Sequence, residues 1–178
     1  MTTTDLVASG EIVDDAARLT LFGTTDPKST LQRMAECAAA LIDVVTTRRL
    51  SVRIQGKDHL TVEAWTTLGA MVGVYAVVEW TRRNEADDGY LARAVAQTLA
   101  GQIVGAAECE CSRHEHNWRS RDAHTLRAMA QTRAISRALR APLGQIVVLA
   151  GYEAASQEEM PRTPETARPG IVSPKQPT

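Results

Sequence analysis

Residues 90–111, with the sequence YLARAVAQTLAGQIVGAAECEC, carry a clear strand pattern. In residues 90–99 the side chains alternate between two faces, which is typical of a half-buried strand. Ala100 and Gly101 make a tight reversal, and residues 102–111 alternate again. The stretch therefore predicts two antiparallel strands joined by a short turn.

The flanking segments extend this pair into a sheet and a helix. Residues 74–82 predict a strand before it, with an acidic turn at residues 84–89 between the two. After it, residues 122–141 carry apolar side chains at helical spacing, and Pro142 is expected to end that helix. Residues 146–149 form an apolar run that we expect to be buried. The order predicts a three-stranded meander followed by a long helix.

Further elements are predicted before the meander. A helix spans residues 26–46, where Asp26 caps the first turn. Residues 51–54 predict a short strand followed by a turn, and residues 61–73 predict a second helix. A short strand is also expected at residues 18–22. Helices thus precede the meander on its N-terminal side.

The length of 178 residues suits one domain with a hydrophobic core. We expect an α+β fold in which an antiparallel β-β-β meander packs against the long C-terminal helix. This domain covers residues 26–160. Residues 1–25 are expected to form a mobile N-terminal arm, and residues 161–178 a disordered, proline-rich tail.

Composition excludes several classes of protein. No window approaches the roughly 18 apolar residues that a membrane span needs, so we expect the protein to stay in the cytoplasm. The net charge of −1 excludes a globally basic protein that coats nucleic acid. Because the chain lacks a nucleophile elbow, a phosphate loop and a dinucleotide-binding motif, we expect neither an enzyme nor a cofactor.

The charge is unevenly distributed along the chain. Residues 113–140 contain seven arginines against two acids. Arg133, Arg137 and Arg140 share one stripe of the predicted helix, whereas the opposite side is apolar, with Ala128, Ile135, Ala138 and Leu139. Like charges at these spacings repel, so the stripe requires solvent, internal acids or an external anion. A solvated helix face and an anion-binding face both fit.

Four residues near the end of the meander are chemically able to hold zinc: Cys109, Cys111, His114 and His116. Zinc sites normally place two to four residues between the ligands of each pair, and this spacing is shorter. The alternative is that the two cysteines fill core space as reduced thiols while the histidines lie on a surface loop. No metal site is therefore assigned, and a zinc-binding protein remains the less favoured alternative.

Three tryptophans could stack on bases, as aromatic platforms of single-strand binders do. Trp65 lies on the apolar side of its predicted helix and is expected in the core. Trp80 and Trp118 are left open by the sequence.

Segments on both sides of the meander resemble a known family. Residues 61–69 (TVEAWTTLG), residues 73–75 (GVY) and residues 129–140 (MAQTRAISRALR) resemble the Rad fifty-two superfamily of recombination proteins, particularly short phage and prophage annealing proteins. Residues 88–89 and 100–101 occupy the positions of that family's paired turns. The resemblance covers about 100 residues and implies the same meander and long helix.

The resemblance implies single-stranded DNA binding and strand annealing in homologous recombination, without ATP or metal. It also implies a homo-oligomer, either a ring or a filament, and the tail is a candidate for binding a protein partner. Under this interpretation we expect DNA contacts from the arginines of the helix and the meander, first Arg133, Arg137 and Arg140, and then Arg93, Arg113, Arg119 and Arg127. A rival interpretation is a non-catalytic oligomeric assembly or adaptor protein, in which acids of a neighbouring subunit pair with the arginine stripe.

Overall fold

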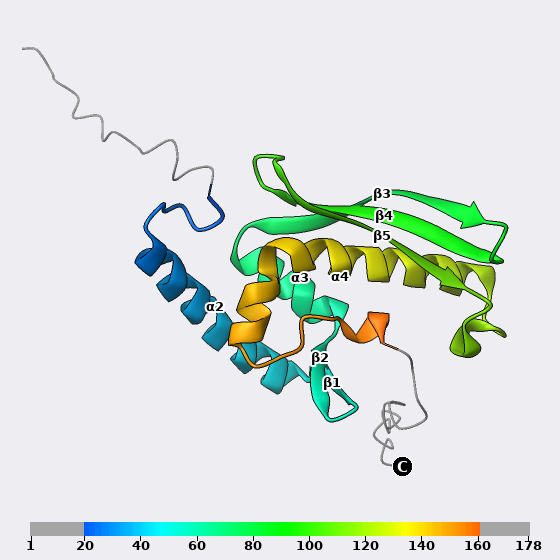
Figure 1. Ribbon diagram of the computed structural model, residues 1–178, viewed down its shortest axis with the longest axis horizontal. Helices are drawn as coiled ribbons and strands as arrows, with labels where there is room; N and C mark the ends of the chain where they lie inside the picture. Colours follow the sequence, from blue (N-terminus) through cyan, green and yellow to red (C-terminus); the bar gives the residue numbers. More distant parts are fainter. Residues whose placement is uncertain (1–19, 161–178) are drawn as a thin grey trace, which may run out of the picture.

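The computed structural model describes residues 20–160 and confirms the α+β fold (Figure 1). Strands β3 (Val74–Asn84), β4 (Gly89–Thr98) and β5 (Ile103–Ser112) form an antiparallel meander in the order β3-β4-β5. Helix α4 (Ala123–Leu149) runs across one face of this sheet. The predictions for the three meander strands were therefore right in type and nearly right in extent.

Small side chains bring α4 close to the sheet. Ala94 of β4 and Ala134 of α4 are both fully buried in the core between them. Gly105 of β5 lies nearer still, because a Cβ atom built there would be only 2.5 Å from the carbonyl oxygen of Ala138. Such a contact excludes any larger side chain at that position.

Pro142 does not end the helix, so that prediction was wrong. It lies inside α4, which continues to Leu149 and changes direction in its C-terminal part (Figure 1). A proline in a helix leaves the carbonyl four residues earlier, here that of Ala138, without its helical donor. That carbonyl faces Gly105, so packing against β5 accommodates the interruption. In the run expected to be buried, Val148 and Leu149 are more than half exposed.

Helix α2 (Pro27–Arg48) begins as the sequence predicts. Asp26 caps it, because its carboxylate accepts from the Ser29 amide at 2.8 Å. Hydrogen bonds from Ser29 hold the pKa of Asp26 below its ordinary value. The strand expected at residues 18–22 is absent from its described part, since residues 20–22 form a bend and a turn that pack against the core instead.

A β-hairpin and a short helix connect α2 to the sheet. Strands β1 (Ser51–Ile54) and β2 (Lys57–Leu60) pair around a turn, although only the first strand was predicted. Helix α3 (Val62–Met71) follows and packs against α4. Its Trp65 is fully buried, as expected.

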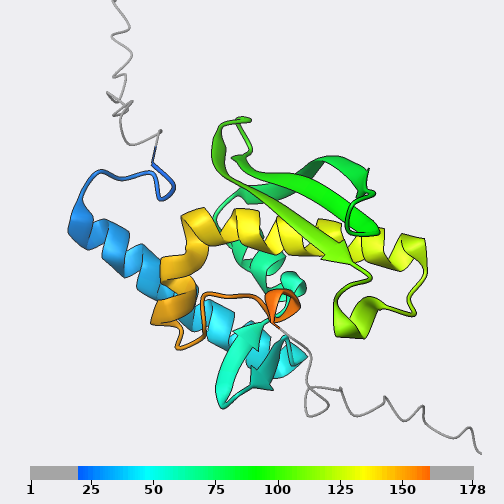
Figure 2. The ribbon, with the colours of Figure 1, turned by 45° about the vertical axis from the view of Figure 1, so that its right-hand side comes forward.

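Residues 152–160, here called the strap, close the described part of the chain (Figure 2). The strap crosses the hairpin, where the Glu153 amide donates to the Asp58 carbonyl at 3.0 Å and His59 Nδ1 lies 2.9 Å from the Ala155 carbonyl. It then makes a short 3-10 turn, η2 (Gln157–Glu159), beside α4. The expected arm up to residue 19 and the tail from residue 161 lie outside the described residues. Among residues 20–160, no helix has the length and apolar character to cross a membrane.

Candidate nucleic-acid interface

The arginine stripe of α4 faces the strap, and two of its members share one carboxylate. Arg137 donates from Nε to Oε2 of Glu159 at 2.9 Å, and its Nη2 lies 2.8 Å from the same oxygen. Arg140 Nη1 lies 3.3 and 3.2 Å from the two oxygens of Glu159. The side chains of Arg137 and Arg140 remain 43% and 34% exposed, whereas that of Glu159 is 9% exposed. Two guanidinium groups therefore converge on one largely buried anion.

Arg133, one turn earlier, is much more enclosed. Its side chain is 14% exposed, and its two terminal nitrogens donate to the two carboxylate oxygens of Glu115 at 2.7 and 2.6 Å. It also donates to the carbonyls of Glu110 and Glu158, each at 2.8 Å. Its guanidinium carbon lies 6.0 Å from the ring centroid of Trp118. Arg133 thus joins β5, the loop after it and the strap.

Arg133 contacts Glu115 and Glu158, and the pKa values of their carboxyl groups are shifted in opposite directions. Burial alone would raise the pKa of Glu115, but the hydrogen bonds and charge of Arg133 outweigh it and hold that pKa below its ordinary value. Burial raises the pKa of Glu158, whose Oε1 accepts from the Val62 amide at 3.0 Å and whose Oε2 is buried without a hydrogen-bond partner. Glu115 is thereby kept ionised by its arginine.

The apolar side of α4 is only partly where the sequence placed it. Ala138 and Leu139 are fully buried, but Ile135 is half-buried and Ala128 is exposed. The strap lies over part of the stripe, because its turn η2 packs beside α4 and supplies Glu159. The cationic face is therefore not freely solvated.

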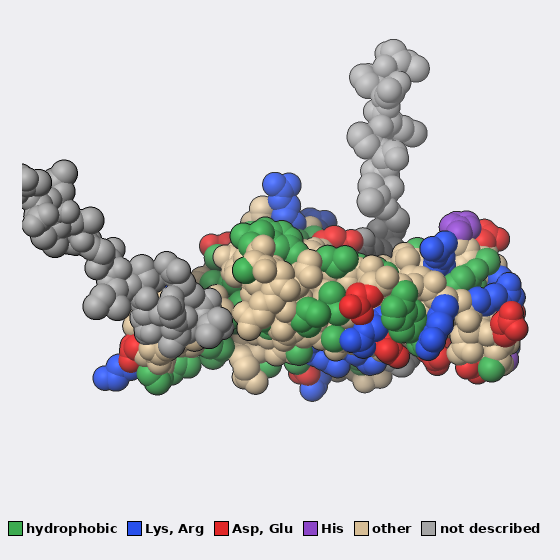
Figure 3. Space-filling model, turned by 90° about the horizontal axis from the view of Figure 1, so that it is seen from above, with side chains coloured by type: hydrophobic (Ala, Val, Ile, Leu, Met, Phe, Trp, Pro, Cys, Tyr) green, Lys and Arg blue, Asp and Glu red, His purple; other side chains and the backbone are tan. Residues whose placement is uncertain are grey.

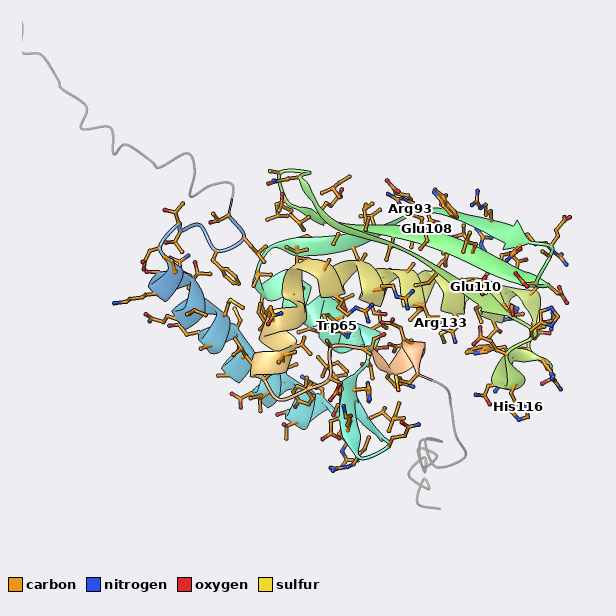
Figure 4. The ribbon with its side chains drawn as sticks, in the orientation of Figure 1. Trp65, Arg93, Glu108, Glu110, His116 and Arg133 are labelled. Carbon is orange, nitrogen blue, oxygen red and sulfur yellow. The ribbon has the colours of Figure 1, made fainter. Side chains whose placement is uncertain are left out.

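The remaining predicted arginines lie in other places. Arg93 is on the outer face of the sheet, where it pairs with Glu79 and Glu108, whereas Arg133 lies on the α4 side (Figure 4). Arg113 follows β5 and pairs with Asp88 at 3.2 Å. Arg119 and Arg127 are exposed near the start of α4, and neither forms an ion pair within residues 20–160. The seven arginines do not form one continuous groove.

The three tryptophans also lie in different surroundings. Trp118, like Trp65, is buried, which leaves its ring little surface on which a base could stack. Trp80 lies on β3, and the guanidinium of Arg82 stacks 4.4 Å from its ring centroid. Of the three, Trp80 alone keeps a partly exposed ring.

The cysteines and histidines are not gathered into one site. Cys109 and Cys111 are buried on β5, and burial raises the pKa of Cys111 to about 12. His114 and His116 are exposed in the loop that follows. Within residues 20–160, no three His, Cys, Asp or Glu side chains are grouped so as to hold a metal ion.

The outer face of the sheet is not covered by any described helix (Figure 1). Figure 3 looks onto this side and shows hydrophobic side chains interspersed with basic and acidic ones. Tyr75 and Val77 of β3 are 46% and 44% exposed, beside the charged trio of Glu79, Arg93 and Glu108. Large apolar side chains beside balanced charges are typical of surfaces that contact another protein.

Comparisons of the chain with protein-family models, with curated proteins and with solved structures give no match. The resemblance to annealing proteins therefore rests on the sequence segments alone.

Sequence reasoning missed the two acids that hold the stripe. Glu115 lies 18 residues before Arg133, and Glu159 lies 22 residues after Arg137. The available signal was the stripe itself, since three like charges on one helix face require anions nearby. That signal indicates that partners exist but does not say which acids they are.

Proposed function

We propose that this chain binds single-stranded DNA and anneals complementary strands in homologous recombination, without ATP or metal. The observation that carries the proposal is the convergence of Arg137 and Arg140 on one carboxylate. A carboxylate and a phosphodiester both present oxygen atoms that share a negative charge, and guanidinium groups bind both through paired hydrogen bonds. The pair is thus built to bind an anion of this shape.

Binding of the DNA phosphate backbone through such an arginine pair suits annealing. Phosphate contacts carry no sequence information, so the base edges of the bound strand stay free to pair. Arg127, on the same helix, and Arg119, in the loop before it, form no ion pair within residues 20–160, so they can hold further phosphates. Arg133 is instead a positioning residue, because Glu115 and two carbonyls already use its donors. The resemblance to annealing proteins supports the same assignment.

The test is a titration of a labelled single-stranded oligonucleotide at 50 and 200 mM salt. Arg137→Gln and Arg140→Gln should weaken binding about equally for any sequence. Each should also flatten the plot of log affinity against log salt by roughly 0.7 per lost phosphate contact. Arg48→Gln, an exposed arginine at the end of α2, is the matched control and should change little. If folded Arg137→Gln and Arg140→Gln variants keep the natural affinity and salt slope, the proposal is wrong.

A second candidate function is oligomeric assembly without nucleic acid. The open sheet face favours it, because Tyr75 and Val77 are exposed there beside balanced charges. In this form the partner is a second copy of the chain. The arginine stripe has no part in it, since its acids come from the same chain. Self-association without any affinity for single strands would favour this candidate.

A further inference from the structure

We propose that Glu159 is a built-in competitor for phosphate: its carboxylate closes the Arg137–Arg140 site in the free protein and leaves it when a strand binds. The inference rests on the proposed function and adds its regulation. It assigns a role to the last described segment of the chain, for which the sequence indicated none.

The first argument is the position of the carboxylate. Both of its oxygens are engaged, Oε2 by Arg137 at 2.8 Å and both oxygens by Arg140 at 3.2 to 3.3 Å. A phosphate between the same two guanidinium groups would occupy the same volume and the same donors. The two anions therefore exclude each other, and binding of a strand requires that Glu159 leave.

The second argument is that the side chain can leave alone. The strap backbone is held on the hairpin by Glu153 and Ala155, and Glu158 accepts from the amide of Val62 at the start of α3. Glu159 itself is held by the arginines and, through Oε1, by the Ser156 amide at 3.4 Å and hydroxyl at 3.2 Å, which belong to a capping box at η2. A change of rotamer breaks these contacts, while the bonds of Glu153, Ala155 and Glu158 keep the strap backbone in place.

The third argument is space. Glu159 lines a pocket of about 340 Å³ between the strap, the loop after β5 and α4, together with Met129, Arg133 and Met160. The pocket has room for a displaced carboxylate. Opening the site therefore does not require the core to move.

The arrangement selects for long strands. One free phosphate must displace Glu159 with a single contact, and the tethered carboxylate has the advantage of high local concentration. A strand that is also held by other arginines brings its phosphate to the site at a similar effective concentration. Mononucleotides and inorganic phosphate should consequently bind poorly to the natural chain.

The experiment compares Glu159→Gln with Glu158→Gln in the full chain. Both remove one negative charge from the same turn, but Glu158 forms no bond to either arginine side chain. Glu159→Gln should bind a labelled single strand more tightly by roughly twofold to thirtyfold, the range expected from two partly exposed ion pairs. The gain should be larger for a tetranucleotide than for a long strand, and Arg137→Gln should abolish it. Glu158→Gln should show no comparable gain.

A second variant guards against misfolding of the first. Glu159→Asp keeps the charge but shortens the side chain by one methylene, so it too should loosen the closure and tighten strand binding. Equal or weaker binding by both Glu159 variants, with the natural chain binding normally, would overturn the inference and leave the proposed function intact. Absence of binding in every variant, including Glu159→Gln, would instead remove the proposed function and this inference with it.

Discussion

Arg133 and Arg137 lie one helical turn apart on α4, yet their surroundings differ. Arg133 is 14% exposed and donates to one carboxylate and two carbonyls, whereas Arg137 is 43% exposed and, within residues 20–160, forms an ion pair with Glu159 only. An enclosed ion pair whose partner is removed leaves a charge without compensation. Arg137 is partly screened by water and shares Glu159 with Arg140, so removing Arg137 leaves Glu159 paired and costs less. Under the proposed function, neighbouring positions of one stripe therefore serve stability and binding separately.

Replacing Arg133 by glutamine should destabilise the fold by about 3 kcal/mol, because Glu115 and two carbonyls lose their donors. Arg137→Gln, the matched change one turn later, should cost no more than about 1 kcal/mol. Urea denaturation at pH 7 measures both. The difference should also depend on pH. Arg133 holds the pKa of Glu115 below its ordinary value of 4.5, so the stabilisation is present above that pH and is lost as the pH falls through the folded-state pKa.

The gap in stability between the natural chain and Arg133→Gln should accordingly narrow in acid, below about pH 4.5. Arg137→Gln serves as the control, since Glu159 keeps its ion pair with Arg140 when Arg137 is replaced. A gap that stays constant from pH 7 into acid would show that the charge of Arg133 does not stabilise the ionised form of Glu115.

Among the elements, those with local sequence signals were predicted and those defined by distant contacts were not. The alternation in residues 90–111 predicts β4 and β5, and Asp26 marks the start of α2, because these signals lie within the element itself. Strand β2 lacks alternation, and its buried His59 is held by a carbonyl of the strap 96 residues away. A pattern within four residues cannot indicate such a partner.

Pro142 also shows that a local sequence signal can be overridden by a distant contact. The local rule that proline ends a helix was overridden, because the carbonyl it frees faces Gly105 of β5. The partners of the arginines could not be predicted for a similar reason. Glu115 and Glu159 belong to a loop and a short turn whose positions depend on the whole fold. The stripe could be predicted, but its enclosure could not.

Gly105→Ala should destabilise the protein by about 1 to 3 kcal/mol, as other overpacked sites do. The added Cβ would lie 2.5 Å from the Ala138 carbonyl oxygen and 3.0 Å from Cδ of Pro142, and neither atom belongs to a flexible side chain that could move aside. Gly144→Ala is the control within α4, because its Cβ would lie 3.6 Å from its nearest neighbour, Cγ of the Arg140 side chain. That change should leave stability unaltered or raise it by up to about 1 kcal/mol. Thermal unfolding of both variants checks the pair; equal effects would mean that β5 and α4 are less closely packed than described.

In the whole molecule, the open sheet face and the arginine stripe lie on different sides of the β3-β4-β5 sheet (Figure 4). The proposed self-association and the proposed strand binding therefore use different surfaces. Light scattering of the full chain with single-stranded DNA should give a multiple of 19.3 kDa. Val77→Glu, which places a charge on the exposed part of β3, should reduce the mass toward one subunit while leaving the fold intact. A natural chain that stays at 19.3 kDa with DNA present would contradict the oligomer.

The strap also sets an order of events in folding. Its contacts with the hairpin and with the first turn of α3 join residues 96 positions apart, so the whole sheet and α4 lie within the loop that these contacts close. Closing such a loop is entropically costly until the intervening chain is already compact. During synthesis on the ribosome, nearly one hundred residues are added after Val62 before Glu158 is present to accept from the Val62 amide. The strap is then the last segment to join, which places the Glu159 carboxylate on its arginines only after the rest of the domain has formed.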